Sequence, residues 1–400
     1  MVPKLAPKLA PKFMAPNSKA RSFPVSVRGM IRPVVPFAVG AALVVAAATL
    51  SSHPARSAGF DHEGLAIQAL DGHIRPGYER FKNTTGALKS ALAEACKAHD
   101  VKADGQVKAA FRSTVLAWSQ VEHIKFGPVL EGNAYERIMF FPDRQKIGER
   151  QVAAILTKQD PTVLTVPELQ QKSVAVQGLT ALEAVLYAKP AESYLAEAPE
   201  AKFACNYASA IAGNIAGIAN NIVAAWAKDG SFSALWLKTG EQNPIYKSSS
   251  GPTAELLTAF RAGISNTRDA KLLPSLGLKK TGPNGPLAPK SKPPFDLSGL
   301  GLATMIANTE GVLELFEKGG LAERLAVTEK DTAVLIKGEL QGAIRIGREM
   351  EPAGAAAFND KDASAKLATM REPLATAAAG NEQLANAAGM VMGFTADDGD

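Results

Sequence analysis

Thr180 and Glu183 are the two side chains whose types and spacing suggest chemistry most directly. They stand three residues apart in a segment with helical periodicity, so both project from the same face of the predicted helix. A carboxylate beside a hydroxyl can hold a hard cation through oxygen, or it can hydrogen-bond a ligand. The alternative is a polar pair that caps a helix or lies inside a helical bundle without any ligand.

Glu122 and His73 are further candidates for a site. Glu122 lies one turn beyond Trp118 on a predicted helix, and carboxylates from neighbouring helices build metal sites inside bundles. A solvated glutamate is the alternative at this position. His73 is the one histidine that we consider as a replacement metal ligand. The alternative is that His73 lies at the surface or caps a helix. Trp118 and Trp226 are interpreted as core anchors, and Asp143 is interpreted as a helix cap.

Several classes of enzyme lack their sequence signatures in this chain. After residue 58 the histidines are His62, His73, His99 and His123. None of them forms H-E-x-x-H, and no two stand four residues apart on one helix, so a zincin-type peptidase has no set of metal ligands. The sequence also contains no G-x-S-x-G motif, no P-loop and no dinucleotide fingerprint. These patterns argue against serine hydrolases and nucleotide-binding enzymes.

Residues 1–58 are predicted to be a targeting segment. They include eight Lys or Arg and no Asp or Glu, and an apolar run covers residues 34–50. A basic head, an apolar centre and a small residue at the exit are typical of a secretory signal. We predict cleavage after Ala58, with Ala55 as the second choice, and translation from Met30. The apolar run of about 17 residues is at the lower limit for crossing a bilayer, so a retained membrane anchor is the alternative.

The charge that remains after this segment does not favour nucleic-acid binding. The whole chain has 44 basic and 39 acidic residues, for a net charge of +5. Without the eight basic residues of the targeting segment, the chain has 36 basic and 39 acidic residues, for a formal charge of −3. The charge therefore gives no argument for a nucleic-acid partner. Membrane contact is expected only through an uncleaved targeting segment.

The chain has two cysteines, Cys96 and Cys205, each near one end of a predicted helix. In an oxidising periplasm a disulfide between them is favoured. Two separately buried thiols are the alternative. A bridge between these positions closes a long loop and typically stabilises a fold by about 2–4 kcal/mol.

Helical periodicity runs through almost the whole chain after the targeting segment, and no alternating strand pattern is present. We therefore predict an all-α protein. In the clearest helix, at 202–228, apolar residues recur every three or four positions along one stripe. The other main helices are predicted at 61–96 with an interruption at Pro76, and at 104–125, 253–269, 302–318, 321–349 and 362–390.

A length of roughly 340 residues after the signal predicts two helical units. The predicted parts are an N-terminal bundle (59–230), a linker rich in Gly, Ser and Pro (231–252), a C-terminal bundle (253–395) and an acidic tail (396–400). A loop rich in Pro and Lys, 274–299, is predicted to be exposed. A weak internal repeat, Leu182–Leu186 and Thr309–Leu313, supports the division.

Several short blocks resemble the imelysin-like family of exported bacterial envelope proteins. These blocks are residues 73–78, 118–128, 140–143 and 178–187, together with the helix that carries Cys205. The family's motif is a helical G-x-H-x-x-E. Gly178 and Glu183 match its first and last positions, whereas Thr180 replaces its histidine. Because a hydroxyl is a poor ligand for a transition metal and imidazole is a good one, the chain resembles a branch with a degenerate motif.

The resemblance implies two pseudo-symmetric helical bundles, export to the periplasm and a link to iron uptake. The leading hypothesis is thus a non-enzymatic envelope protein that binds metal, with iron as the expected ion and Glu183 as the best candidate ligand. The alternative is a helical interaction module that docks an envelope partner through a cleft between the two units. A third hypothesis is a metallopeptidase, the class in which the family was once placed.

Overall fold

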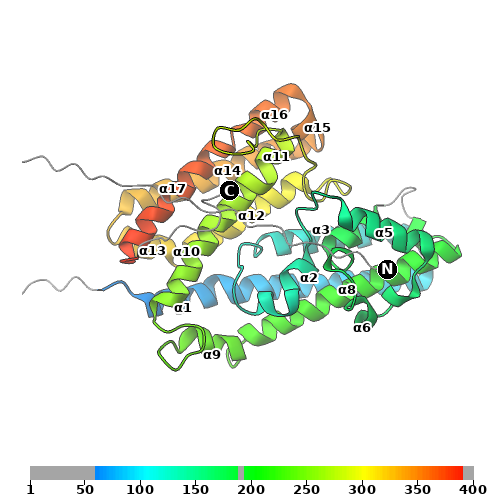
Figure 1. Cartoon of the computed structure of the whole chain (residues 1–400), viewed down its shortest axis with the longest axis horizontal. Helices are drawn as coiled ribbons and strands as arrows, with labels where there is room; N and C mark the ends of the chain where they lie inside the picture. The colour runs from blue at the N-terminus through cyan, green and yellow to red at the C-terminus, as the bar shows by residue number, and fades with distance from the viewer. Residues whose placement is uncertain (1–58, 188–192, 391–400) are drawn as a thin grey trace, which may run out of the picture. The chain divides into compact units, whose positions relative to one another are not determined.

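Helices make up the regular structure of this protein (Figure 1). The computed structural model describes residues 59–187 and 193–390. Within these ranges every regular element is helical, apart from an isolated antiparallel bridge between Lys280 and Leu287. The predicted all-α class is therefore confirmed. The targeting segment 1–58 and the acidic tail 396–400 lie outside the described residues.

The α-helices fall into an earlier and a later set along the chain. The earlier set is α1 (His62–Ala69), α2 (Arg75–Ala98), α3 (Asp104–Ser119), α4 (Ala134–Ile138), α5 (Ile147–Lys158), α6 (Val166–Leu169), α7 (Leu179–Leu186), α8 (Pro199–Trp226) and α9 (Ser231–Leu237). The later set is α10 (Ser250–Ser265), α11 (Leu273–Leu276), α12 (Gly301–Glu317), α13 (Leu321–Ala326), α14 (Lys330–Met350), α15 (Ala356–Asn359), α16 (Lys361–Ala368) and α17 (Arg371–Ala387). Two π-helical segments are η1 (Leu70–Ile74) and η7 (Asn266–Leu272). The short 3-10 segments are η2 (Val101–Ala103), η3 (Gly127–Asn133), η4 (Pro161–Val163), η5 (Val174–Val176), η6 (Ser193–Leu195) and η8 (Glu351–Ala353).

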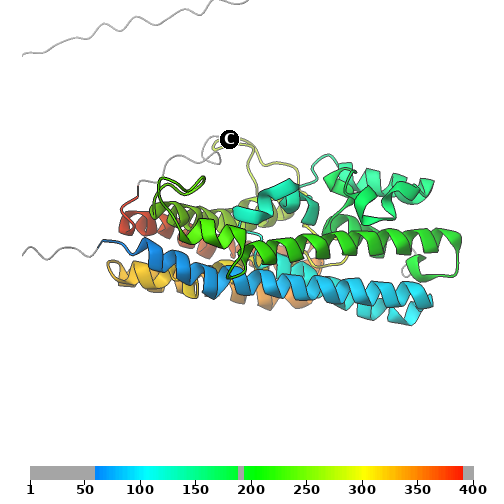
Figure 2. The same cartoon turned by 90° about the horizontal axis from the view of Figure 1, so that it is seen from below.

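The two longest helices of the earlier set, α2 and α8, lie side by side (Figure 2), and α3 packs against α2. The predicted apolar stripe of α8 faces inward, so Tyr207, Ile211 and Trp226 are buried. A disulfide joins Cys96 in the last turn of α2 to Cys205 in α8, with the two Cα atoms 5.7 Å apart. The predicted disulfide is thereby confirmed.

Among the described residues, α8 is the one helix long and apolar enough to cross a membrane. However, 56% of its most apolar window is buried inside the structure. An apolar helix packed on several sides is also what the centre of a helical bundle requires, and α8 contacts α2, α6 and α7.

In the later set, α12 packs against α10 and α14, and α17 packs against α14 and α10. The two sets are in contact, because α12 packs on α3 and α1 packs on α10. The described residues form one compact unit, and their division into two bundles stays a prediction. The segment 231–252, predicted to be a linker, contains α9 and buries Trp236, whose indole N–H donates to the Ala66 carbonyl at 2.9 Å.

Some element boundaries differ from the predicted ones. The interruption in the first helix falls at η1, ahead of Pro76, because proline is tolerated in the first turn of α2. The helix predicted at 321–349 is two helices, α13 and α14, and the one predicted at 362–390 is α16 and α17. The loop 274–299 is not exposed throughout as predicted. Two of its residues near the end, Pro294 and Phe295, are buried, and the Phe295 ring centroid lies 6.1 Å from that of Phe111 in α3.

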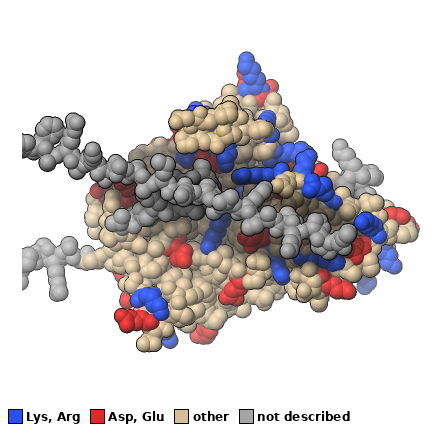
Figure 3. All heavy atoms as spheres, viewed as in Figure 1, with Lys and Arg blue, Asp and Glu red and all other residues tan. Residues whose placement is uncertain are grey.

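Acidic and basic side chains are interspersed on the face shown in Figure 3. The basic ones are most frequent around the loop that follows α11, where Lys280, Lys290 and Lys292 are exposed. Lys290 is anchored there, because its Nζ donates to the Phe358 carbonyl at 2.7 Å.

Candidate functional site

Gly178 positions the helix that carries the candidate carboxylate. It is the N-terminal cap residue of α7, and a Cβ atom at this position would lie 2.5 Å from the carbonyl oxygen of Ile138 and 2.7 Å from that of Arg137. Only glycine allows the backbone to approach so closely. The glycine thus sets the start of α7, and the apolar helix that follows carries Glu183 into the interior.

Glu183 is 6% exposed and is hydrogen-bonded by a residue of the loop that precedes α12. Both the backbone N–H and the hydroxyl of Ser298 donate to its Oε1, at 2.8 and 2.6 Å. Burial raises the pKa of Glu183 to about 7, although these two hydrogen bonds favour the charged form. Asp296 adds to the rise in pKa, and Lys292 opposes it. This carboxylate therefore changes charge near neutral pH.

Thr180, predicted to act beside Glu183, is partly exposed. Among the described residues the hydroxyl that bonds Glu183 is that of Ser298, not that of Thr180. No local signal predicts this partner, because Ser298 lies 115 residues away in a loop without periodicity.

Glu122 belongs to a second, separate buried network. It is 3% exposed, so it is not the solvated glutamate of the alternative interpretation. Its Oε2 accepts hydrogen bonds from Lys271 Nζ at 2.6 Å and from Asn308 Nδ2 at 2.9 Å, and its Oε1 accepts one from Asn266 Nδ2 at 3.0 Å. Lys271 Nζ also donates to Asn308 Oδ1 at 2.7 Å. The network joins the end of α3 to η7 and α12.

The network stabilises the charged form of Glu122. Burial opposes its ionisation, but the charge and hydrogen bond of Lys271 and the bonds from two asparagines outweigh burial and lower its pKa. Burial also lowers the pKa of Lys271, and the attraction to Glu122 opposes this change. The geometry supports an ion pair, because every donor around the carboxylate points at it.

His73 is fully buried, not at the surface or at a cap, and it lies in the π-helical turn η1. Its Nε2 is 3.0 Å from Nε2 of His123, and its Nδ1 is 3.5 Å from Oε2 of Glu314. Burial lowers the pKa of His73, with Glu314 opposing, and burial together with His73 lowers the pKa of His123 well below its usual value. Burial also opposes ionisation of Glu314. The nearby His73, Lys318 and Arg80 nevertheless hold the pKa of Glu314 at about 2.

The predicted candidates are therefore distributed over three places. Glu183 is bonded to Ser298, Glu122 to Lys271, and His73 to His123. The described ranges contain no group of three or more His, Cys, Asp or Glu side chains that could hold a metal ion. The sequence interpretation missed Ser298, Lys271 and the two partners of His73, which are His123 and Glu314. Of these residues only His123 stands in a block that resembles the family.

Two other interpretations from the sequence agree with the structure. Asp143 caps α5, because its side-chain oxygens accept hydrogen bonds from the backbone N–H groups of Ile147 and Gly148 at 2.6 and 2.8 Å. Trp118 and Trp226 are core anchors, 0% and 1% exposed.

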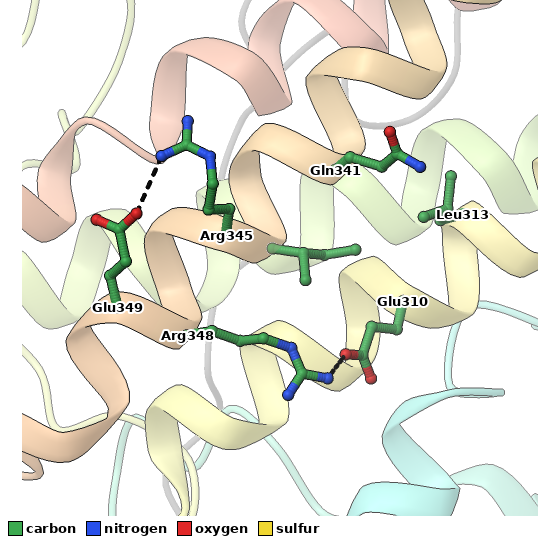
Figure 4. Close-up of a pocket in the computed structure, with 7 residues that line it drawn as sticks. Glu310, Leu313, Gln341, Arg345, Arg348 and Glu349 are labelled. Atoms are coloured by element: carbon green, nitrogen blue, oxygen red, sulfur yellow. Dashed lines mark hydrogen bonds and ion pairs between the residues drawn. The ribbon is translucent and has the colours of Figure 1, made fainter.

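A shallow groove of about 610 Å³ lies away from these networks, between α12 and α14 (Figure 4). Leu313 and Ile344 line it, and two ion pairs, Arg348–Glu310 and Arg345–Glu349, flank it. Glu310 stands where the weak internal repeat places the counterpart of Glu183. The two glutamates differ chemically, because Glu310 is paired with an exposed arginine whereas Glu183 is buried.

The fold and these buried groups define an all-helical protein with a motif carboxylate in its interior. Residues 74–385 match the sequence model of the imelysin family, and the chain belongs to that family. No curated protein matches the sequence.

Two solved structures share the fold. One is an imelysin-like protein from Psychrobacter arcticum, with a TM-score of 0.68 and 18% identity over 83% of this chain and 97% of the other. The second is described as an iron-regulated protein A precursor from Parabacteroides distasonis, with a TM-score of 0.67 and 13% identity over the same shares. At these identities the likeness concerns the fold.

Glu183 should make stability depend on pH in a defined window. Its folded pKa of about 7 lies above the ordinary value of 4.5, so the stability that it contributes is fully present below about pH 4.5 and is lost as the pH rises through 7. Relative to Glu183→Gln, the wild type should lose up to about 1.4 kcal/mol per pH unit and about 3 kcal/mol in all. Urea unfolding of both proteins at pH 5 and pH 7.5 measures this difference. An equal change with pH in the two proteins would contradict it.

Proposed function

We propose that the protein is an exported, non-enzymatic binding protein of the bacterial periplasm that takes part in iron acquisition. The observation that carries the proposal is the buried carboxylate of Glu183 at the last position of the family motif, held by exchangeable N–H and O–H donors and not by a basic side chain. Such a carboxylate can exchange these donors for a ligand, whereas Glu122 forms an ion pair with Lys271.

The residues around Glu183 supply only some of the ligands that a metal site needs. Thr180 replaces the motif histidine, and the described residues bring no three ligating side chains together. The oxygen donors present suit a hard cation, and the remaining ligands would have to come with it, as water or a chelating molecule. A peptidase mechanism needs a metal with at least three protein ligands and a general base, and this donor set does not favour it.

Two further observations support the proposal. The basic and apolar pattern of residues 1–58 is typical of an export signal. One protein with the same fold is described as an iron-regulated protein A precursor.

Calorimetric titration of the protein with iron, copper or calcium ions tests the proposal. We expect saturable heat with iron, and at least a tenfold weaker affinity in Glu183→Gln. The matched control is Glu310→Gln, which changes the glutamate at the corresponding position of the internal repeat and should bind as the wild type does. The absence of saturable heat with every ion, or equal binding by Glu183→Gln, would contradict direct metal binding.

A further inference from the structure

Residues 292–299, here termed the strap, lie directly against the motif carboxylate. The strap precedes α12, and Ser298 donates two hydrogen bonds to a single oxygen, Oε1 of Glu183. The Ser298 hydroxyl also lies 3.2 Å from the Phe295 carbonyl of the strap itself. The two Ser298 donors therefore occupy hydrogen-bonding positions on Oε1 that another donor or a cation would need.

The backbone of the strap is held in an unfavourable conformation. Phe295 has φ = 55°, in the left-handed region that a bulky L-residue rarely adopts and that costs energy unless its surroundings impose it. Gly299 has φ = 71°, which glycine adopts freely. The buried Phe295 ring and the two Ser298 bonds keep the strap in place against this strain, so release of Ser298 would also allow the strain to relax.

The outer side of the strap is attached only weakly. Lys292 and Asp296 form an ion pair at 3.0 Å within the strap, with side chains 74% and 36% exposed. Exposed pairs of this kind contribute little to stability, and this one does not connect the strap to any helix. The contacts that close the strap are therefore those of the buried Pro294 and Phe295 and the hydrogen bonds of Ser298.

We propose that the strap is a closing element, which covers the Glu183 carboxylate and must lift before a ligand can reach it. In the closed state Ser298 takes the place of the ligand. The lifted state exposes Glu183, and an incoming ligand competes with Ser298 for the same oxygen. The identity of that ligand rests on the proposed function, whereas the motion does not.

Chemical labelling measures access to Glu183 without any ligand. The full chain is treated with a water-soluble carbodiimide and an amine, and modification of Glu183 is followed by peptide mass spectrometry. We expect labelling about tenfold faster in Ser298→Ala, which loses one hydrogen bond to a charged group. The matched control is Ser291→Ala, at an exposed serine upstream of the strap, and it should not change the rate. An equal rate in Ser298→Ala and the wild type would overturn the proposal.

Labelling of Glu122 in the same samples reports unfolding, because that carboxylate is buried in a different network. If Ser298→Ala unfolds, the milder Ser298→Cys keeps the backbone donor and a weaker side-chain donor. We expect it to show an intermediate rate of Glu183 labelling, and a rate equal to that of the wild type would again overturn the proposal.

A second experiment measures the binding of ferrous ion by calorimetry under anaerobic conditions. Because less free energy is needed to open the strap, Ser298→Ala should bind ferrous ion about tenfold more tightly than the wild type. Equal or weaker binding by Ser298→Ala would overturn the closing role. If neither protein binds the ion, the proposed function fails, and the labelling rates still decide whether the strap lifts.

Discussion

Replacement of Lys271 by methionine is expected to lower the free energy of unfolding by about 3–5 kcal/mol. The change removes the ammonium group 2.6 Å from Glu122 and leaves a buried carboxylate without its counter-charge. The side chains of the pair are 0% and 4% exposed, so water cannot replace the lost partner. Urea unfolding at neutral pH, followed by circular dichroism, measures the loss.

Two control variants separate the loss of the charge from the loss of the side chain. The double variant Lys271→Met/Glu122→Gln removes both charges and should recover much of the stability, because no unpaired charge remains. Lys82→Met removes a partly exposed lysine paired with Glu79 at 2.7 Å and should cost less than about 1 kcal/mol. A Lys271→Met protein as stable as Lys82→Met would contradict the interpretation of a buried ion pair.

Removal of the disulfide is expected to destabilise the protein by about 2–5 kcal/mol. The bridge joins residues 109 positions apart, and a bond that closes so long a loop greatly restricts the unfolded chain. The variant Cys96→Ala/Cys205→Ala avoids the introduction of polar groups at buried sites. Urea unfolding of this variant and of the oxidised wild type measures the difference.

A reducing agent supplies the control for the disulfide. It should lower the unfolding midpoint of the wild type toward that of the double alanine variant and leave the variant unchanged. A thiol assay confirms that the bond is open. A wild type that keeps its midpoint while both thiols are free would show that the bridge contributes nothing to stability.

The periodic parts of the sequence could be predicted well, because a helix is specified by residues a few positions apart. The apolar stripe of α8 and the cap at Asp143 are examples of such local patterns. The disulfide could be predicted because the chain has two cysteines and its first 58 residues are predicted to be an export signal. The ends of helices were predicted less well, because short breaks such as that between α13 and α14 depend on packing.

The partners of the candidate site residues could not be predicted, because they are distant in sequence and have no local pattern. From the sequence alone, Lys271 would be interpreted as a solvated lysine near the end of a helix. Only the folded chain brings it to Glu122, 149 residues away. Ser298 lies in a segment rich in proline that looks like an exposed loop. The motif therefore identified Glu183, whereas the chemistry around it depends on the way the strap packs against α7.

The bridge between Cys96 and Cys205 has a topological consequence. Residues 97–204 form a ring closed by the sulfur atoms, and this ring includes both Glu122 and Glu183. A protease that cuts the backbone once inside the ring leaves two fragments that remain covalently joined. The nicked chain would migrate as one species on a gel without reducing agent and as two fragments with it.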